Sequence, residues 1–239
     1  MIDNQAPVSN MAPKSQSNAV LKILSIFLGS SILIGFTFQF ASVTHDQRER
    51  IRELERSMQE LKAAMNVDSV RQYNLKKIIA IIDRYNSKLS PELKYKIANE
   101  IYEMSIKYPN LDVDLICATI THESNHTWDP KVVSRAGAMG LMQIMPATGM
   151  YVSQLEGIPW TSPEEVLFNP IYNIRIGCRY LSSMISIYNI DGGLAAYNGG
   201  ERIAAMWLKN DKDNAVLWSE TRKYVPSVLK LYQEYQNMN

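Results

Sequence analysis

A glutamate at the end of an apolar helical segment, Glu123, has the surroundings that most clearly suggest chemistry. The segment from Leu115 to Glu123 reads LICATITHE, and helical spacing places the carboxylate beside Ile116, Thr119 and Ile120. A carboxyl group held against apolar surface is poorly hydrated when charged, so its pKa rises. A general acid needs such a raised pKa near neutral pH. Position alone equally allows a surface glutamate at a frayed helix end.

The stretch His122 to His126 also matches the H-E-x-x-H motif of zinc peptidases. On this hypothesis the two histidines bind zinc and Glu123 activates a metal-bound water. The longer metzincin motif fails, because Asp129 and Val132 stand where a glycine and a third histidine are needed. Pro130 also ends the helix soon after the second histidine. Sensitivity to a chelator would distinguish a zinc peptidase from the other classes considered below.

Two further segments carry residue types that suit contact with a ligand. Gly137 and Gly140 lie three apart, just ahead of Gln143, and glycine lets the backbone approach a ligand closely. If it binds no ligand, the first segment is an ordinary turn. It is not a phosphate loop, because it lacks the Gly-Lys-Ser/Thr of that motif. Tyr197 and Asn198 directly precede two glycines. The second segment is otherwise an ordinary helix C-cap.

Taken in this order, the segments resemble the lytic transglycosylases of the soluble, Slt type, which share a lysozyme-like fold. The chain carries their Glu-Ser pair at Glu123-Ser124, their GLMQ block at Gly140 to Gln143 and their AYN block at Tyr197-Asn198. Residues 173–181 and 220–225 also look like segments of that family. The resemblance spans about residues 90–236. It implies a mainly α, goose-type lysozyme-like domain.

The resemblance implies cleavage of the β-1,4 bond between N-acetylmuramic acid and N-acetylglucosamine in peptidoglycan. Family members use one glutamate as acid and then as base, while the C6 hydroxyl of the sugar closes a 1,6-anhydro ring. One carboxylate therefore suffices where most glycosidases need two. Carried to this chain, the resemblance makes Glu123 catalytic, requires no cofactor or metal, and assigns substrate binding to Ser124, Ser134, Gly140, Met142, Gln143, Met145, Tyr197, Asn198 and Glu220.

One departure from the family leaves two alternatives open. The segment between Glu123 and Ser134 is longer than the common family spacing, which affects the match at Ser134 but not at Gln143. Asp129 in this segment could be a second carboxylate, which would indicate a hydrolytic lysozyme; before Pro130 it equally suits a turn cap. A non-catalytic scaffold that binds peptidoglycan is the other alternative.

The N-terminal part of the chain has a different composition. Residues 1–18 are rich in Asn, Gln, Ser and Pro and predict a disordered tail. From Ile23 to Val43 the sequence has 21 residues without a charge, enough to cross a hydrocarbon core of about 30 Å. A signal peptide would have a shorter apolar region and a stronger cleavage site than Ala41-Ser42-Val43. We therefore predict a transmembrane helix over residues 19–43.

Residues 44–69 predict a helical stalk. Ile51, Leu54, Met58, Leu61 and Met65 repeat at alternating spacings of three and four, which is a short heptad pattern. The pattern suits a coiled coil that joins two copies as a homodimer. It suits equally a solvated helix that continues out of the membrane.

Residues 70–239 predict one helical domain. Helix starts are indicated at Ser90-Pro91, at Asp112 or Asp114, and at Ser162-Pro163. Helical spacing continues over 174–188 and 216–235, and the sequence shows no alternating strand pattern. The two cysteines, Cys117 and Cys178, allow either two buried thiols or one disulfide bridge.

The charges that flank the apolar span and the location of the cell wall indicate opposite orientations of the chain in the membrane. The net charge is +1 and the basic residues are scattered, so nucleic-acid binding is not supported. Four arginines between 48 and 56 follow the apolar span, whereas two lysines precede it, which alone would place the C-terminal side in the cytoplasm. Because the wall lies outside the membrane, we predict instead a single-pass bacterial inner-membrane protein with its catalytic domain in the periplasm. A secretion, pilus or flagellar assembly is a compatible partner.

Overall fold

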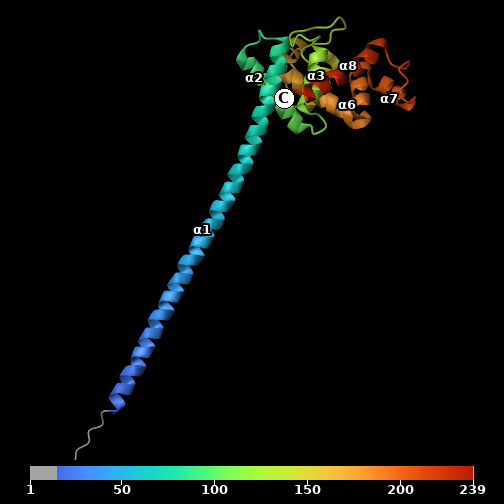
Figure 1. Ribbon diagram of the computed structural model, residues 1–239. Coiled ribbons are helices and arrows are strands. Elements are labelled where there is room, and N and C mark those ends of the chain that lie inside the picture. The colour runs from blue at the N-terminus through green and yellow to red at the C-terminus, as the bar shows by residue number, and fades with distance from the viewer. Residues whose placement is uncertain (1–14, 239) are drawn as a thin grey trace, which may run out of the picture. The chain divides into compact units, whose positions relative to one another are not determined.

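The computed structural model describes residues 15–238, and the side chains of residues 20–45 and 47–238. The chain divides into two compact units, Met1–Asn66 and Val67–Asn239. Helix α1 (Ser15–Tyr85) begins in the first unit and ends in the second (Figure 1). Most of the predicted tail at 1–18 lies outside the described residues, and its last four residues are helical.

The first unit carries the apolar span and the heptad residues on α1. By length and composition, α1 is able to cross a membrane. A helix satisfies its own backbone hydrogen bonds, as a segment in hydrocarbon must. Each of the heptad side chains is more than half exposed: Ile51, Leu54, Met58, Leu61 and Met65. The homodimer through this stripe stays a prediction.

The second unit is mainly α, as the sequence predicted. After the end of α1, its described residues form α2 (Pro91–Lys107), α3 (Val113–Glu123), α4 (Pro146–Leu155), α5 (Pro163–Leu167), α6 (Pro170–Gly199), α7 (Glu201–Lys209) and α8 (Ser219–Gln236). No strand is assigned among residues 15–238, although isolated bridges join Met139 to Val133 and to Ile144. Helix α3 packs against α2 and α8, and both of these also pack against α6 (Figure 1).

Helix caps set where three of these helices begin. The side chains of Ser90, Asp112 and Ser162 accept hydrogen bonds from the backbone N–H of the third residue of α2, α3 and α5, respectively. Each cap satisfies a donor that has no partner inside its helix. The predicted starts are therefore confirmed, and Asp112 rather than Asp114 caps α3. The Asp114 carboxylate instead accepts from the Lys77 ammonium at 3.0 Å.

Helix α6 is interrupted shortly before its C-terminal end. Asn189 has φ 60° and ψ −176°, which breaks the helix into two segments. The first segment contains the predicted helix over 174–188, and the second carries Tyr197 and Asn198 to the end at Gly199. A Cβ on Gly193 would lie 2.6 Å from Ile185 Cγ1, so the two segments can pack only with glycine there.

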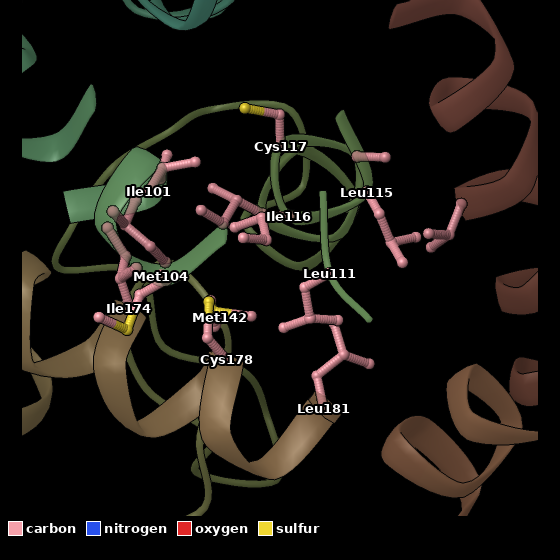
Figure 2. Close-up of a cluster of buried hydrophobic side chains, with 14 of the residues drawn as sticks. Ile101, Met104, Leu111, Leu115, Ile116, Cys117, Met142, Ile174, Cys178 and Leu181 are labelled. Atoms are coloured by element: carbon pink, nitrogen blue, oxygen red, sulfur yellow. The ribbon is translucent and has the colours of Figure 1, made fainter. Parts of the chain in front are cut away.

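The core of the second unit surrounds α3. Ile116 of α3 is fully buried among Ile101 of α2, Met142 of the following loop and Ile174 of α6 (Figure 2). A helix that is apolar on nearly all sides is typical of a domain centre. Cys117 and Cys178 are both buried free thiols, which resolves the alternative left open by the sequence. The unbridged Cys178 Sγ lies 4.0 Å from the Met142 Sδ.

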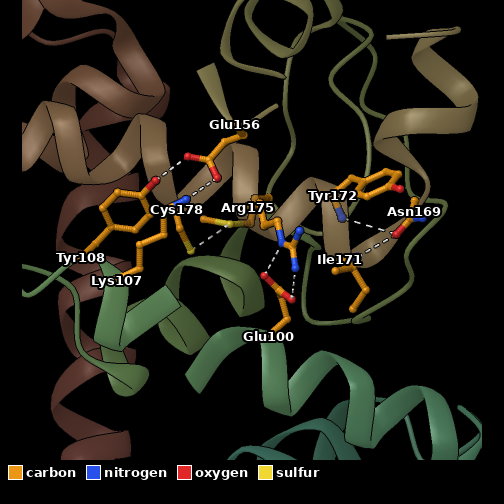
Figure 3. Close-up of polar contacts among 10 residues, drawn as sticks. Glu100, Lys107, Tyr108, Glu156, Asn169, Ile171, Tyr172, Arg175 and Cys178 are labelled. Carbon is orange, nitrogen blue, oxygen red and sulfur yellow. Dashed lines mark hydrogen bonds and ion pairs between the residues drawn. The ribbon is translucent and has the colours of Figure 1, made fainter. Parts of the chain in front are cut away.

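Two buried carboxylates tie α2 and the end of α4 to α6. Glu156, with 2% of its side chain exposed, accepts from the Tyr108 hydroxyl at 2.6 Å and pairs with Lys107 and Arg179 (Figure 3). Glu100 holds Arg175 through two contacts of 2.6 and 3.1 Å. Because an unpaired buried charge costs about 3–5 kcal/mol, these pairs fix the helix arrangement on which the site depends.

Candidate active site

The backbone turns sharply directly after Glu123, the last residue of α3. Asn125, His126 and Trp128 all have left-handed φ angles, of 52°, 60° and 48°, which side-chain-bearing residues adopt only at a cost. Trp128 holds the turn in place, because its indole N–H donates to Thr121 Oγ1 at 2.9 Å. Such a turn fixes the end of α3 and the position of the Glu123 carboxyl.

Glu123 lies in a cleft with a volume of about 500 Å³. Burial raises the pKa of its carboxyl to about 8; the Tyr224 hydroxyl opposes this rise and the Glu220 charge adds to it. The direction agrees with the prediction from helical spacing. Seven of the predicted site residues line the cleft: Glu123, Ser134, Gln143, Met145, Tyr197, Asn198 and Glu220.

Two tyrosines flank the carboxyl in different ways. The Tyr197 hydroxyl donates its hydrogen bond to the backbone carbonyl of Met142 at 2.8 Å. The buried Tyr224 hydroxyl interacts with the Glu123 carboxyl but has no partner in full hydrogen-bond geometry among the described residues. Tyr224 is therefore the donor available to Glu123. Sequence reasoning assigned it no role, although it lies one helical turn after Glu220 on α8.

The loop before α4 forms one wall of the cleft. Gln143 has a φ of 48°, and its amide nitrogen donates to the carbonyls of Val132 and Gly140 at 3.2 and 2.9 Å. These bonds fix the side chain and leave its amide oxygen as the group that can meet a ligand. Ser134 Oγ accepts from the Ala138 N–H at 3.0 Å, while Met145 is exposed.

Three of the predicted substrate-binding residues do not line the cleft. Ser124 is buried, and its hydroxyl oxygen accepts from the Trp128 N–H at 3.1 Å. A Cβ on Gly140, whose φ is +78°, would lie 2.3 Å from the Leu167 carbonyl, so glycine there serves internal packing. Met142 is fully buried in the core. These three residues therefore support the wall of the cleft from inside the domain, because other protein atoms pack directly against them.

Asn173 on α6 is a further residue that sequence reasoning gave no role. Its side chain is fully buried and makes three hydrogen bonds to the loop and to the end of α5. The amide oxygen accepts from the Met142 N–H at 2.8 Å, and the amide nitrogen donates to the carbonyls of Met139 and Leu167, both at 2.9 Å. Asn173 thus positions the segment that carries Gln143.

The end of α6 is joined to the start of α8 at the other wall. Asn198 Oδ1 accepts from Thr221 Oγ1 at 2.8 Å. A Cβ on Gly199 would lie 2.7 Å from the same hydroxyl oxygen, so the close approach requires glycine. This junction brings Asn198 and Glu220 to the cleft together.

Part of the chain matches a known protein family. Residues 100–216 match the family model described as Transglycosylase SLT domain. The matched segment, residues 100–216, is called the SLT domain below. The chain is 38% identical over 112 residues to the soluble lytic murein transglycosylase of Escherichia coli K12, covering 43% of this chain and 17% of that protein. It is 33% identical over 132 residues to membrane-bound lytic murein transglycosylase C of Shigella sonnei, covering 51% and 36%.

A solved structure supports the same assignment of the fold. An inactive mutant of lytic transglycosylase Slt from Pseudomonas aeruginosa matches the chain with a TM-score of 0.52 and 29% identity. The match covers 64% of this chain and 25% of that one. The chain therefore spans only a minor part of the relatives' length.

Two alternative roles predicted for the segment after α3, a zinc site at His122 and His126 and a second catalytic carboxylate at Asp129, are not supported by its geometry. Helix α3 ends at Glu123, so His126 lies in the turn and its ring centroid is 6.5 Å from that of His122. Among the described side chains, those of residues 20–45 and 47–238, no group of three is suited to a metal, so the zinc hypothesis lacks its ligand set. Asp129 is exposed and accepts from the Lys131 N–H at 2.9 Å, as a turn cap does, and it does not line the cleft.

The partly buried Glu123 carboxyl predicts a pH dependence of folding stability. The pKa of Glu123 is about 8 in the folded SLT domain against 4.5 when exposed, so its contribution is present below pH 4.5 and is lost as the pH rises through about 8. The Glu123→Gln protein carries no such group. We expect its melting temperature, relative to wild type, to be higher at pH 9 than at pH 5. An equal difference at both values would show that the carboxyl is not buried.

Proposed function

We propose that the SLT domain cleaves peptidoglycan strands between N-acetylmuramic acid and N-acetylglucosamine, with Glu123 as the acid. The observation that carries this proposal is the pKa of about 8 at a carboxyl inside a cleft. Such a group is protonated at neutral pH and can donate to a glycosidic oxygen. The names of the relatives, and the inactivity of the Pseudomonas mutant in which glutamine replaces glutamate, support the same role.

The proposed reaction needs one carboxyl in two successive roles. Glu123 donates its proton to the bridging oxygen as the bond from that oxygen to C1 breaks, and positive charge develops at C1. The resulting carboxylate accepts the proton of the C6 hydroxyl while that oxygen bonds to C1, which forms the 1,6-anhydro end. The Tyr224 hydroxyl is placed to stabilise the carboxylate between the two steps, because it lacks another partner among the described residues.

Hydrolysis is a second candidate because Glu220 lines the same cleft. A second carboxylate could activate water, and glycosidases commonly use two such groups. In this alternative the second carboxylate is Glu220 rather than Asp129, which lies outside the cleft.

The product distinguishes the two reactions. We expect mass spectrometry of digested peptidoglycan to show anhydro ends, with the same ends formed by Glu220→Gln protein. Ends heavier by about 18 Da would instead show attack by water. We also expect EDTA to leave the rate unchanged, and inhibition that zinc reverses would support a metal-dependent peptidase.

We also propose that residues 19–43 anchor the protein in the bacterial inner membrane with the SLT domain in the periplasm. The apolar span and the membrane-bound name of one relative support this placement. We expect the full chain to stay in the membrane fraction after an alkaline wash, and protein lacking residues 1–45 to be released. A periplasm-dependent reporter at the C-terminus is expected to be active. An inactive reporter would favour the orientation given by the flanking charges.

A further inference from the structure

A second cavity adjoins the catalytic cleft. This cavity, the side pocket, has a volume of about 450 Å³, and His122 lines both it and the cleft. Because His122 directly precedes Glu123, the side pocket opens beside the carboxyl proposed to cleave the strand. A group attached to a bound sugar could therefore reach it.

The side pocket is built mainly by helices that flank the SLT domain. Arg84 and Tyr85 come from the end of α1 and Lys230 from α8, all outside the matched residues 100–216. Buried hydroxyls hold these two helices together, since the Tyr235 hydroxyl donates to that of Tyr85 at 3.1 Å and lies 2.9 Å from Thr121 Oγ1. The pocket is thus a fixed feature that the family match alone would not reveal.

The side pocket is rich in hydrogen-bond donors. Its only carboxylate, Glu234, is already paired with Arg84. The side chains of Lys230, His122 and His126 make no hydrogen bond or ion pair with any described residue, so three nitrogen-bearing groups face the pocket without a partner. The rings of His122 and His126 are held edge-on against Tyr224 and Tyr85, at 4.8 and 5.7 Å. Such an arrangement complements a carboxylate.

We propose that the side pocket binds a free carboxylate of the peptide stem on the N-acetylmuramic acid next to the cleaved bond. This inference rests on the proposed function, because it takes peptidoglycan as the substrate. The stem is anionic and branches from the same sugar whose bond Glu123 would break. Lys230 supplies the charge, because burial lowers the pKa of His122 and favours its neutral form. Cleavage then depends on the stem as well as on the glycan.

The test compares two substrates and three proteins. The substrates are glycan strands with stems and strands from which an amidase has removed the stems, and the readout is the ratio of their kcat/KM values. We expect a ratio above one for wild type and a ratio about tenfold lower for Lys230→Gln, the usual loss for one charge-assisted hydrogen bond. The matched control is Lys223→Gln, an exposed lysine on α8 outside both cavities, which should keep the wild-type ratio.

A binding measurement separates this proposal from the proposed function. The probe is the stem tetrapeptide that the amidase releases. It is titrated into the Glu123→Gln protein, which is expected not to cleave, and into the double variant Glu123→Gln, Lys230→Gln. We expect weaker binding by about tenfold in the double variant. If wild type cleaves neither substrate, the proposed function fails while the titration still tests the pocket. If wild type cleaves strands and Lys230→Gln changes neither the ratio nor the binding, the side-pocket proposal is wrong.

Discussion

Peptidoglycan cleavage by Glu123→Gln protein is expected to be slower than by wild type by about 10³- to 10⁴-fold, the upper part of the range for lost proton transfer. Glutamine has nearly the same shape but cannot donate and then accept the proton. Because the acid is neutral at pH 7, a neutral amide should fit the buried site without unfolding it. The measurement is the release of soluble fragments, with pelleting on insoluble peptidoglycan to show that binding is retained.

Two controls sharpen this prediction. The wild-type rate should fall as the pH rises above about 8, because the proton that Glu123 donates is lost there. Glu220→Gln should reduce the rate far less than Glu123→Gln if Glu220 only shapes the cleft. A Glu123→Gln protein that cleaves within tenfold of wild type would exclude this residue as the acid, and loss of binding together with cleavage would indicate a damaged fold.

Asn173→Leu is expected to cause a large loss of stability, at least about 3 kcal/mol in the free energy of unfolding. Leucine has the same branched side-chain skeleton as asparagine but no polar atoms, so it leaves the Met142 N–H and the carbonyls of Met139 and Leu167 buried without their partner. Each unsatisfied group costs roughly 1–3 kcal/mol. Urea unfolding followed by circular dichroism measures the change.

The matched control for Asn173→Leu is Asn214→Leu, at an exposed asparagine in the segment before α8. We expect this substitution to change stability by less than about 0.5 kcal/mol. Because Asn173 positions the loop that carries Gln143, the Asn173→Leu protein should also lose cleavage activity at temperatures where it is still folded. Wild-type stability in the Asn173→Leu protein would show that the three hydrogen bonds contribute little.

Local patterns in the sequence were enough to predict the helix starts and a raised pKa at Glu123, while the catalytic role proposed for this residue came from the family resemblance. Ser90 and Ser162 mark helix starts because a cap depends only on the next three residues of the chain. The raised pKa of Glu123 was predicted from the apolar neighbours that helical spacing places beside it. The apolar span at 23–43 is a matter of composition and length. In each case the physical cause acts over one or two helical turns.

Only the tertiary structure decided what surrounds that acid. Tyr224 and Glu220 reach Glu123 from α8, about a hundred residues further along the chain. Asn173 holds the Gln143 loop across 31 positions, and the same packing fills the space at Gly140 and Met142 that sequence reasoning had left for a sugar. Contacts between such distant segments depend on how whole helices pack, and no local pattern specifies that packing.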